Sequence, residues 1–129
     1  TGGLFLQKNL AVSGTEFVPM PIAFTEDEVA VLLDEPVSLQ VVISNEGNVD
    51  SYDVVVLILV TDEFEETVYE SKNKISSIGP KESKIFLTDP INIEKGIQHE
   101  WFIKIEEIED EEELTDNLLS VYGFIPPES

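Results

Sequence analysis

The sequence predicts an all-β fold, an antiparallel sandwich of about seven strands with an extra N-terminal strand. Apolar and polar residues alternate with a period of two in several short runs. Turn-forming residues separate these runs, and no window keeps apolar residues at the three- and four-residue spacing of an amphipathic helix. Short strands divided by such turns are typical of two packed sheets.

The clearest strand covers residues 37–43, where apolar side chains alternate with more polar neighbours. Each inward side chain should contribute about 1.5 to 3 kcal/mol through burial. The next run, residues 52–60, is apolar on both faces and rich in β-branched residues. This composition predicts a central strand that is covered on both sides.

Further strands and turns complete one domain over residues 17–125. Strands are expected at residues 67–71, 83–88, 99–106 and 117–124, with edge pieces at 22–24 and 29–33. Turn signals lie at Lys72-Asn73, Gly79-Pro80, Asp89-Pro90, Lys95-Gly96 and the acidic run 109–113. This spacing favours an immunoglobulin-like sandwich, followed by a stiff tail at residues 126–129.

Residues 1–16 are left over once these strands are counted, and they form an extension with a strand pattern of their own. Leu4, Leu6, Leu10 and Val12 fall on one face, and glycines on either side of the run would act as hinges. The extension either folds back as an eighth strand, which we favour for a lone module, or adds to a neighbouring molecule as a donor strand. In the second case these four side chains are the assembly residues.

The charge of the chain restricts its partners. The 129 residues include 27 acidic residues against 7 lysines, giving a formal net charge of -20. Such a surface repels nucleic acid and anionic lipid, because both are bound through Lys and Arg. No stretch of 18 apolar residues exists, so direct membrane insertion is not expected. The absence of cysteine removes disulfides and thiol chemistry.

Two acidic loops are candidates for an irregular calcium site. One contains Asp110, Glu111, Glu113 and Asp116, and the other contains Asp62, Glu63, Glu65 and Glu66. Clustered carboxylates are the oxygen ligands that Ca²⁺ prefers, although the EF-hand pattern is absent. The alternative, which we favour, is that both runs are solvated loops and that the chain has no cofactor.

The sequence lacks the parts of the common enzyme sites, so we predict that the chain is not an enzyme. His99 is the only histidine, and it is expected on a strand facing solvent or the sheet rim. No nucleophile elbow or phosphate-binding glycine loop appears, and close acid pairs of the glycosidase kind would arise here by chance. Trp101, Tyr52 and Tyr122 continue apolar rows and are assigned to the core.

Three motifs resemble the CARDB family, the cell-adhesion-related domain of bacterial and archaeal surface proteins. They are the strand and Asn-x-Gly turn at residues 41–48, the turn at 78–83 and the acidic approach to the last strand at 112–117. Lys81 stands where the family often has glycine, and Asp116-Asn117 replaces its usual paired asparagines. The resemblance implies a seven-stranded immunoglobulin-like fold and a role in surface architecture or adhesion, without catalytic residues.

We therefore expect an extracellular or cell-surface structural or adhesive protein, with a pilus-like filament subunit joined by strand donation as the specific hypothesis. Its expected partners are further copies of itself or another surface protein. The first residue, Thr1, fits a mature product after removal of a signal peptide or a piece of a longer chain. The alternative is a carbohydrate- or protein-binding accessory module of a larger secreted protein.

Overall fold

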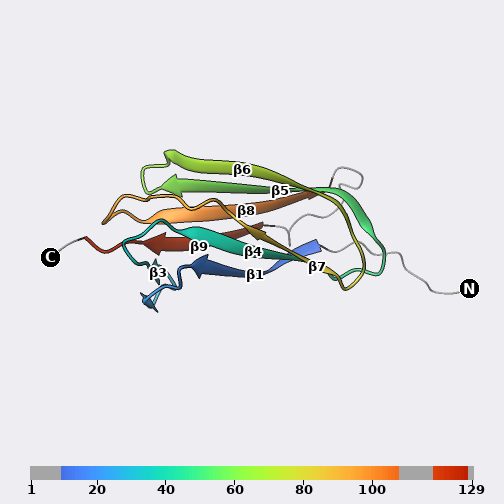
Figure 1. The fold of residues 1–129 in the computed structure, drawn as a ribbon, viewed down its shortest axis with the longest axis horizontal. Coiled ribbons are helices and arrows are strands. Elements are labelled where there is room, and N and C mark those ends of the chain that lie inside the picture. The colour runs from blue at the N-terminus through green and yellow to red at the C-terminus, as the bar shows by residue number, and fades with distance from the viewer. Residues whose placement is uncertain (1–9, 108–117, 128–129) are drawn as a thin grey trace, which may run out of the picture.

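The computed structural model describes residues 10–107 and 118–127 as two packed β-sheets (Figure 1). The strands are β1 (Leu10–Val18), β2 (Ala23–Phe24), β3 (Ala30–Val31), β4 (Ser38–Asn45), β5 (Ser51–Asp62), β6 (Thr67–Ile78), β7 (Ser83–Leu87), β8 (His99–Glu107) and β9 (Leu118–Phe124). One sheet has the order β1-β4-β7, and the other has the order β2-β3-β9-β8-β5-β6. The predicted all-β sandwich is confirmed. The described part of the chain contains no helix suited to crossing a bilayer.

The hydrophobic core lies between the sheets and is built from the inward rows of the central strands. The fully buried members of these rows include Leu39, Val41, Ile43, Val54, Val56, Ile58, Val60, Ile103 and Ile105. Trp101 of β8 is completely buried, as predicted, and its ring meets that of Phe17 edge-on, with centroids 4.9 Å apart and an interplanar angle of 79°. This contact ties β1 of one sheet to β8 of the other.

β1 is an integral strand of the smaller sheet. It pairs antiparallel with β4, from Leu10 opposite Asn45 to Val18 opposite Ser38. Leu10 and Phe17 are each only 2% exposed. Between Val12 and Gly14 the register shifts, so the Ser13-Gly14 step predicted as a hinge lies at a strand irregularity. Residues 10–16 therefore lie in the sandwich beside β4.

β6 is longer than the sequence predicts. It runs to Ile78, and Lys72 and Asn73 pair with Leu57 and Val56 of β5. The predicted turn at these two residues is therefore wrong. Ile75 and Ile78 face the core with exposures of 6% and 0%, and their burial holds the strand together beyond the polar residues.

The outer face of the six-stranded sheet also differs from expectation. The outward row of β5, formed by Val55, Leu57 and Leu59, is half-buried, and neither of the two sheets lies over it. The prediction that β5 is covered on both sides is wrong. Tyr52 and Tyr122 are 45% and 37% exposed, so their assignment to the core is also wrong. An alternating pattern defines two faces but does not identify which one is inward.

The two ends of the sandwich are distinct. β1 and β9 both point toward the left end of Figure 1, where β3 lies. β3 pairs with β9 in parallel, with Ala30 opposite Gly123, and this is the one parallel pair among the described strands. A Cβ added to Gly123 would lie 3.0 Å from Leu32 and 3.4 Å from Phe17, so glycine permits close packing here. Leu10 lies at the opposite end, beside the turn that follows β4.

Candidate functional site

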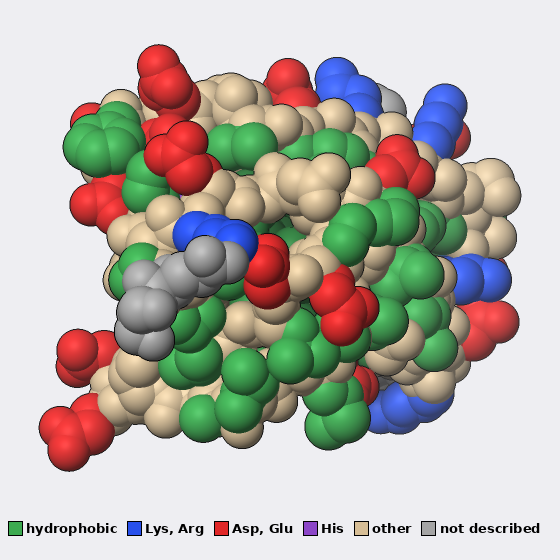
Figure 2. Space-filling view, turned by 60° about the vertical axis from the view of Figure 1, so that its left-hand side comes forward, with side chains coloured by type: hydrophobic (Ala, Val, Ile, Leu, Met, Phe, Trp, Pro, Cys, Tyr) green, Lys and Arg blue, Asp and Glu red, His purple; other side chains and the backbone are tan. Residues whose placement is uncertain are grey.

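Large apolar side chains are exposed at every second position between the end of β1 and β2. We call Val18, Met20, Ile22 and Phe24 the apolar row, and their exposed fractions are 43%, 69%, 65% and 62%. Pro19 and Pro21 separate them. Figure 2, which brings this end of the molecule forward, shows hydrophobic side chains gathered across its lower half.

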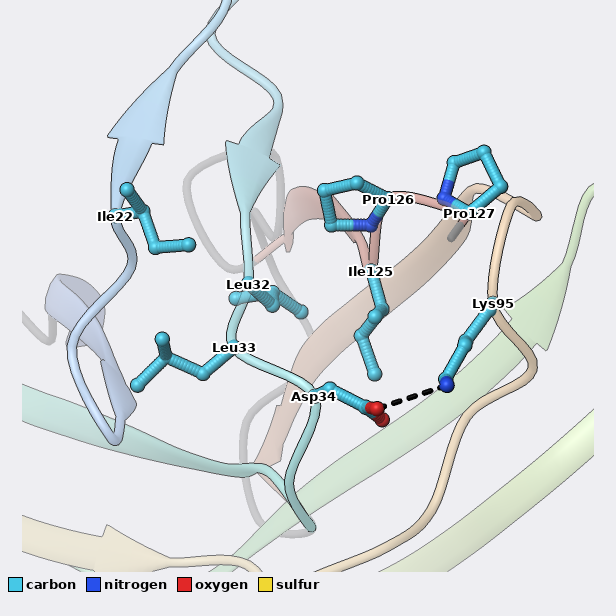
Figure 3. A pocket seen from close by; sticks show the side chains of 8 residues that line it. All are labelled: Ile22, Leu32, Leu33, Asp34, Lys95, Ile125, Pro126 and Pro127. Carbon is cyan, nitrogen blue, oxygen red and sulfur yellow. Dashed lines mark ion pairs between the residues drawn. The ribbon is translucent and has the colours of Figure 1, made fainter. Parts of the chain in front are cut away.

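An open groove adjoins the apolar row and shares Ile22 with it. Its volume is about 430 Å³, and it is lined by Ile22, Leu32, Leu33, Asp34, Lys95, Ile125, Pro126 and Pro127. In Figure 3 Ile22 and Leu33 lie on one side and Pro126 and Pro127 on the other, with the ion pair of Asp34 and Lys95 below. The Lys95 Nζ lies 2.8 Å from Asp34 Oδ2. The groove thus has apolar walls and a charged rim.

Backbone hydrogen bonds fix the walls of the groove. The N–H of Ile22 donates to the carbonyl of Val31 at 2.8 Å. The N–H of Leu32 donates to the carbonyl of Phe124, also at 2.8 Å. On the far wall, the N–H of Gly96 donates to Ile125 at 2.7 Å. Gly96 has φ of 79°, which glycine adopts without a Cβ clash, so the predicted Lys95-Gly96 turn is present. The lining residues lie in the loops and turns that adjoin β2, β3 and β9, and these backbone hydrogen bonds hold the loops in place.

Acidic side chains surround this surface. Glu26, Asp27 and Glu28 are exposed in the loop between β2 and β3, and Asp34 and Glu35 are exposed at the groove. The hydroxyl of Thr25 accepts hydrogen bonds from the N–H groups of Asp27 and Val29 at 3.2 and 3.1 Å, which orders the loop. The surface therefore favours an apolar partner that carries positive charge.

The predicted calcium residues do not form a site in the described part of the chain. Asp110, Glu111, Glu113 and Asp116 lie outside it. In the other loop, Asp62 Oδ1 accepts hydrogen bonds from the N–H groups of Phe64 and Glu66 at 2.8 and 3.0 Å. Glu63 Oε1 accepts one from the N–H of Gln98 at 3.1 Å.

These carboxylates, with Glu65 at a positive φ of 65°, shape and anchor the turn between β5 and β6. No group of three or more His, Cys, Asp or Glu within residues 10–107 and 118–127 is arranged to hold a metal ion. The described part of the loop at 62–66 therefore holds no preformed arrangement of calcium ligands.

The four predicted assembly residues fall into two pairs. Leu10 is buried beside β4, and Val12 lies opposite Ile43 and packs against the core. Leu4 and Leu6 lie outside the described residues. Leu10 and Val12, two of the four predicted assembly residues, are thus part of their own sandwich.

His99 is buried rather than exposed on the strand. It is 2% exposed, and its ring Nδ1 lies 2.9 Å from the carbonyl oxygen of Ile97. Its ring centroid lies 6.3 Å from that of Trp101. The expectation that it faces solvent or the sheet rim is wrong, because β8 directs it inward with Trp101 and Ile103. A buried ring held by a neighbouring carbonyl is a structural element of the core.

Two of the motifs that resemble CARDB meet at one end of the sandwich. The N–H of Asn45 donates to the carbonyl of Glu82 at 2.9 Å, and the N–H of Lys81 donates to the carbonyl of Asn45 at 2.8 Å. The turn after β4 and the turn before β7 are therefore joined directly. The third motif, at residues 112–117, lies outside the described residues.

The sequence analysis missed the apolar row, although its signal is visible. Residues 18–24 alternate large apolar residues with proline or alanine. We interpreted residues 22–24 of this run as an edge piece of the sandwich. The four large side chains of this run are all exposed.

Solved structures share this fold. The CARDB domain of the PF1109 protein from Pyrococcus furiosus, crystallised in complex with di-metal ions, matches with a TM-score of 0.63 and 15% identity, over 98% of this chain and 100% of that one. The C-terminal domain of Wzt matches with a TM-score of 0.56 and 13% identity, over 97% of this chain and 78% of that one. No family model and no curated protein matches the chain. The predicted resemblance is confirmed at the level of the fold, which is the immunoglobulin-like sandwich of a CARDB domain.

Proposed function

We propose that the chain is a non-catalytic structural or adhesive module of the cell surface that associates with further copies of itself. The observation that carries this proposal is the apolar row beside a preformed groove. Met20, Ile22 and Phe24 each expose more than half of their surface, at 69%, 65% and 62%. Several large exposed apolar side chains within one short segment of a strongly charged protein favour an interaction site.

The fold supports a surface role through its likeness to the CARDB domain, since the family resemblance implies adhesion or surface architecture. A non-catalytic role is supported by the use of chemically capable side chains in the structure. His99 is held in the core, and Asp62 shapes a turn. The finer form of the proposal is an extracellular filament subunit whose N-terminal segment contacts the next molecule.

Self-association is tested by sedimentation velocity of the full chain over a wide range of protein concentration. We expect the mean sedimentation coefficient to rise with concentration, because the apolar row is buried when molecules meet. A single monomeric species at every concentration would contradict the proposed function.

A second candidate function is a carbohydrate- or protein-binding accessory module, and the outer face of the six-stranded sheet favours it. Tyr122 lies opposite Glu100, and Phe102 lies opposite Ser120. Tyr122 and Phe102 are therefore diagonal neighbours on adjacent strands. Residues in this relation lie about 7 to 8 Å apart. The hydroxyl of Ser120 donates to Glu100 at 2.6 Å, which places a polar pair between them. Aromatic faces with adjacent polar groups suit sugar rings.

This alternative is tested by calorimetric titration with soluble polysaccharides. Binding that Tyr122→Ala abolishes, with the fold retained in circular dichroism, would favour the accessory module. Ile85→Ala is the matched control, because Ile85 is 65% exposed on the opposite sheet.

A further inference from the structure

The apolar row and the groove require an occupant from outside their own sandwich. The exposed fractions of the row, 43% to 69%, show that no described segment covers it. Leu4, Phe5 and Leu6 form a short apolar segment of the sequence that precedes β1. The length of chain before Leu10 decides whether this segment can come from the same molecule.

The segment cannot reach the groove of its own molecule. Leu4 is six residues from Leu10, so their Cα atoms can be at most about 22 Å apart. β1 has nine residues and carries the chain about 26 Å from Leu10 to Val18. The groove lies beyond this end, where Leu32 and Ile125 flank the end of β9. The occupant must therefore come from another molecule.

Strand addition does not suit this edge. The N–H of Ile22 is directed to Val31, and neighbouring N–H groups of an extended chain point to opposite edges. The outward-facing neighbours of Ile22 are Pro21, which has no N–H, and Ala23, which supplies a single donor. Pro19 lacks a donor as well. The row therefore offers side-chain packing rather than a ladder of hydrogen bonds.

Charge selects among apolar occupants. Glu26, Asp27, Glu28 and Glu35 are exposed in the segments that flank the surface, and Asp34 is paired with Lys95. A second apolar row would bring the same acids against them, and an anionic lipid surface would also be repelled. Residues 4–9 contain three large apolar residues and Lys8, without any acid. This segment matches both the apolar and the electrostatic character of the surface.

We infer that residues 4–8 of one copy dock on the apolar row and groove of the next copy. The donor segment leaves the sandwich at Leu10, and the acceptor lies at the opposite end, so the contact is head to tail. A head-to-tail contact that does not close on itself generates an open fibre. This inference deepens the proposed function and rests on it.

The test uses the full chain in two variants with complementary defects. The donor variant carries Leu4→Asp and Leu6→Asp, and the acceptor variant carries Met20→Asp and Ile22→Asp. The control carries Ile85→Asp and Leu87→Asp on β7, where the exposures of 65% and 60% match those of the acceptor pair. All three add the same charge. Circular dichroism and melting temperature establish that each variant is folded.

We expect the donor and acceptor variants each to lose self-association in sedimentation velocity by about tenfold or more in dissociation constant relative to the control. Mixed together, they should form a 1:1 dimer that grows no further, because the mixture contains one intact donor and one intact acceptor. This complementation is specific to a head-to-tail contact.

Three outcomes would overturn the inference. If the donor variant associates like the control while the acceptor variant does not, the row packs on another row. If the mixture stays monomeric although each variant is folded, the contact is not head to tail. If both variants associate as the control does, the inference fails while the proposed function stands. A wild-type chain that is monomeric throughout overturns both.

Discussion

Asn45 joins three parts of the chain through one buried side chain. It is 1% exposed, and its Nδ2 donates to the carbonyls of Val49 and Ile78 at 2.8 and 2.9 Å. Its Oδ1 accepts a hydrogen bond from the N–H of Gly47 at 2.9 Å. The side chain thus closes the turn after β4 and fixes it to the end of β6. Its amide needs both donors and an acceptor in this orientation.

We predict that Asn45→Ala lowers the free energy of unfolding by about 2 to 4 kcal/mol, because buried carbonyl and N–H groups lose their partners. Asn45→Asp should cost at least as much at neutral pH, since it directs a carboxylate oxygen at two carbonyls. Urea unfolding measures both. Asn92→Ala, at an exposed position, is the control. An Asn45→Asp variant as stable as the control would contradict this role.

Lys81 has a backbone conformation that is unusual for a residue with a side chain. Its φ is 68°, in the left-handed region. We predict that Lys81→Gly raises the free energy of unfolding by about 0.5 to 1 kcal/mol, because the strain of a side chain at positive φ is removed. Lys72→Gly, in the exposed face of β6, should instead lower it by a similar amount. Thermal unfolding compares the two variants. If both substitutions raised the free energy of unfolding, or both lowered it, the account would be contradicted.

At the level of elements, the strands with strong alternation were predictable and their partners were not. The rows of β4 and β8 are visible as buried positions two residues apart, and Trp101 is in the core as expected. The end of β6 depends on pairing with β5, which polar residues such as Lys72 do not reveal. The exposure of the apolar row depends on which face of the edge is left uncovered, a property of tertiary packing.

β1 gives a prediction that separates stability from assembly. If residues 4–8 contact the next copy, deleting residues 1–9 leaves β1 intact, and the melting temperature of the monomer should be unchanged. Deleting residues 1–14 removes Leu10, which is 2% exposed and should contribute about 1.5 to 3 kcal/mol through burial alone. Its melting temperature should fall. Equal stability of the two truncated chains would show that the first half of β1 does not support the core.

The acidic residues between positions 110 and 116 carry the remaining calcium prediction. If Asp110, Glu111, Glu113 and Asp116 bind Ca²⁺, calcium at about 100 times the dissociation constant should stabilise the fold by about 2.7 kcal/mol. Melting in calcium and in chelator measures this difference. Asp110→Asn with Glu113→Gln should abolish it, whereas Asp27→Asn with Glu26→Gln changes the charge equally and should not. An unchanged melting temperature would identify the acids as solvated surface.

At the level of the whole molecule, apolar attraction and net charge oppose each other. Two copies with a formal charge of -20 each repel over distances comparable to the Debye length, which is about 10 Å at 0.1 M salt. The apolar row is unaffected by this screening. Assembly through the row should therefore strengthen as salt is added, which is the reverse of the behaviour of an interface formed by ion pairs.

Electron microscopy of the purified full chain in about 0.5 M salt, where the Debye length is well below 10 Å, tests the central claim most directly. The account predicts linear particles in which sandwiches repeat end to end, joined at the groove formed by Ile22, Leu33 and Ile125. Isolated single sandwiches at the highest protein concentration, or closed pairs joined face to face, would contradict it.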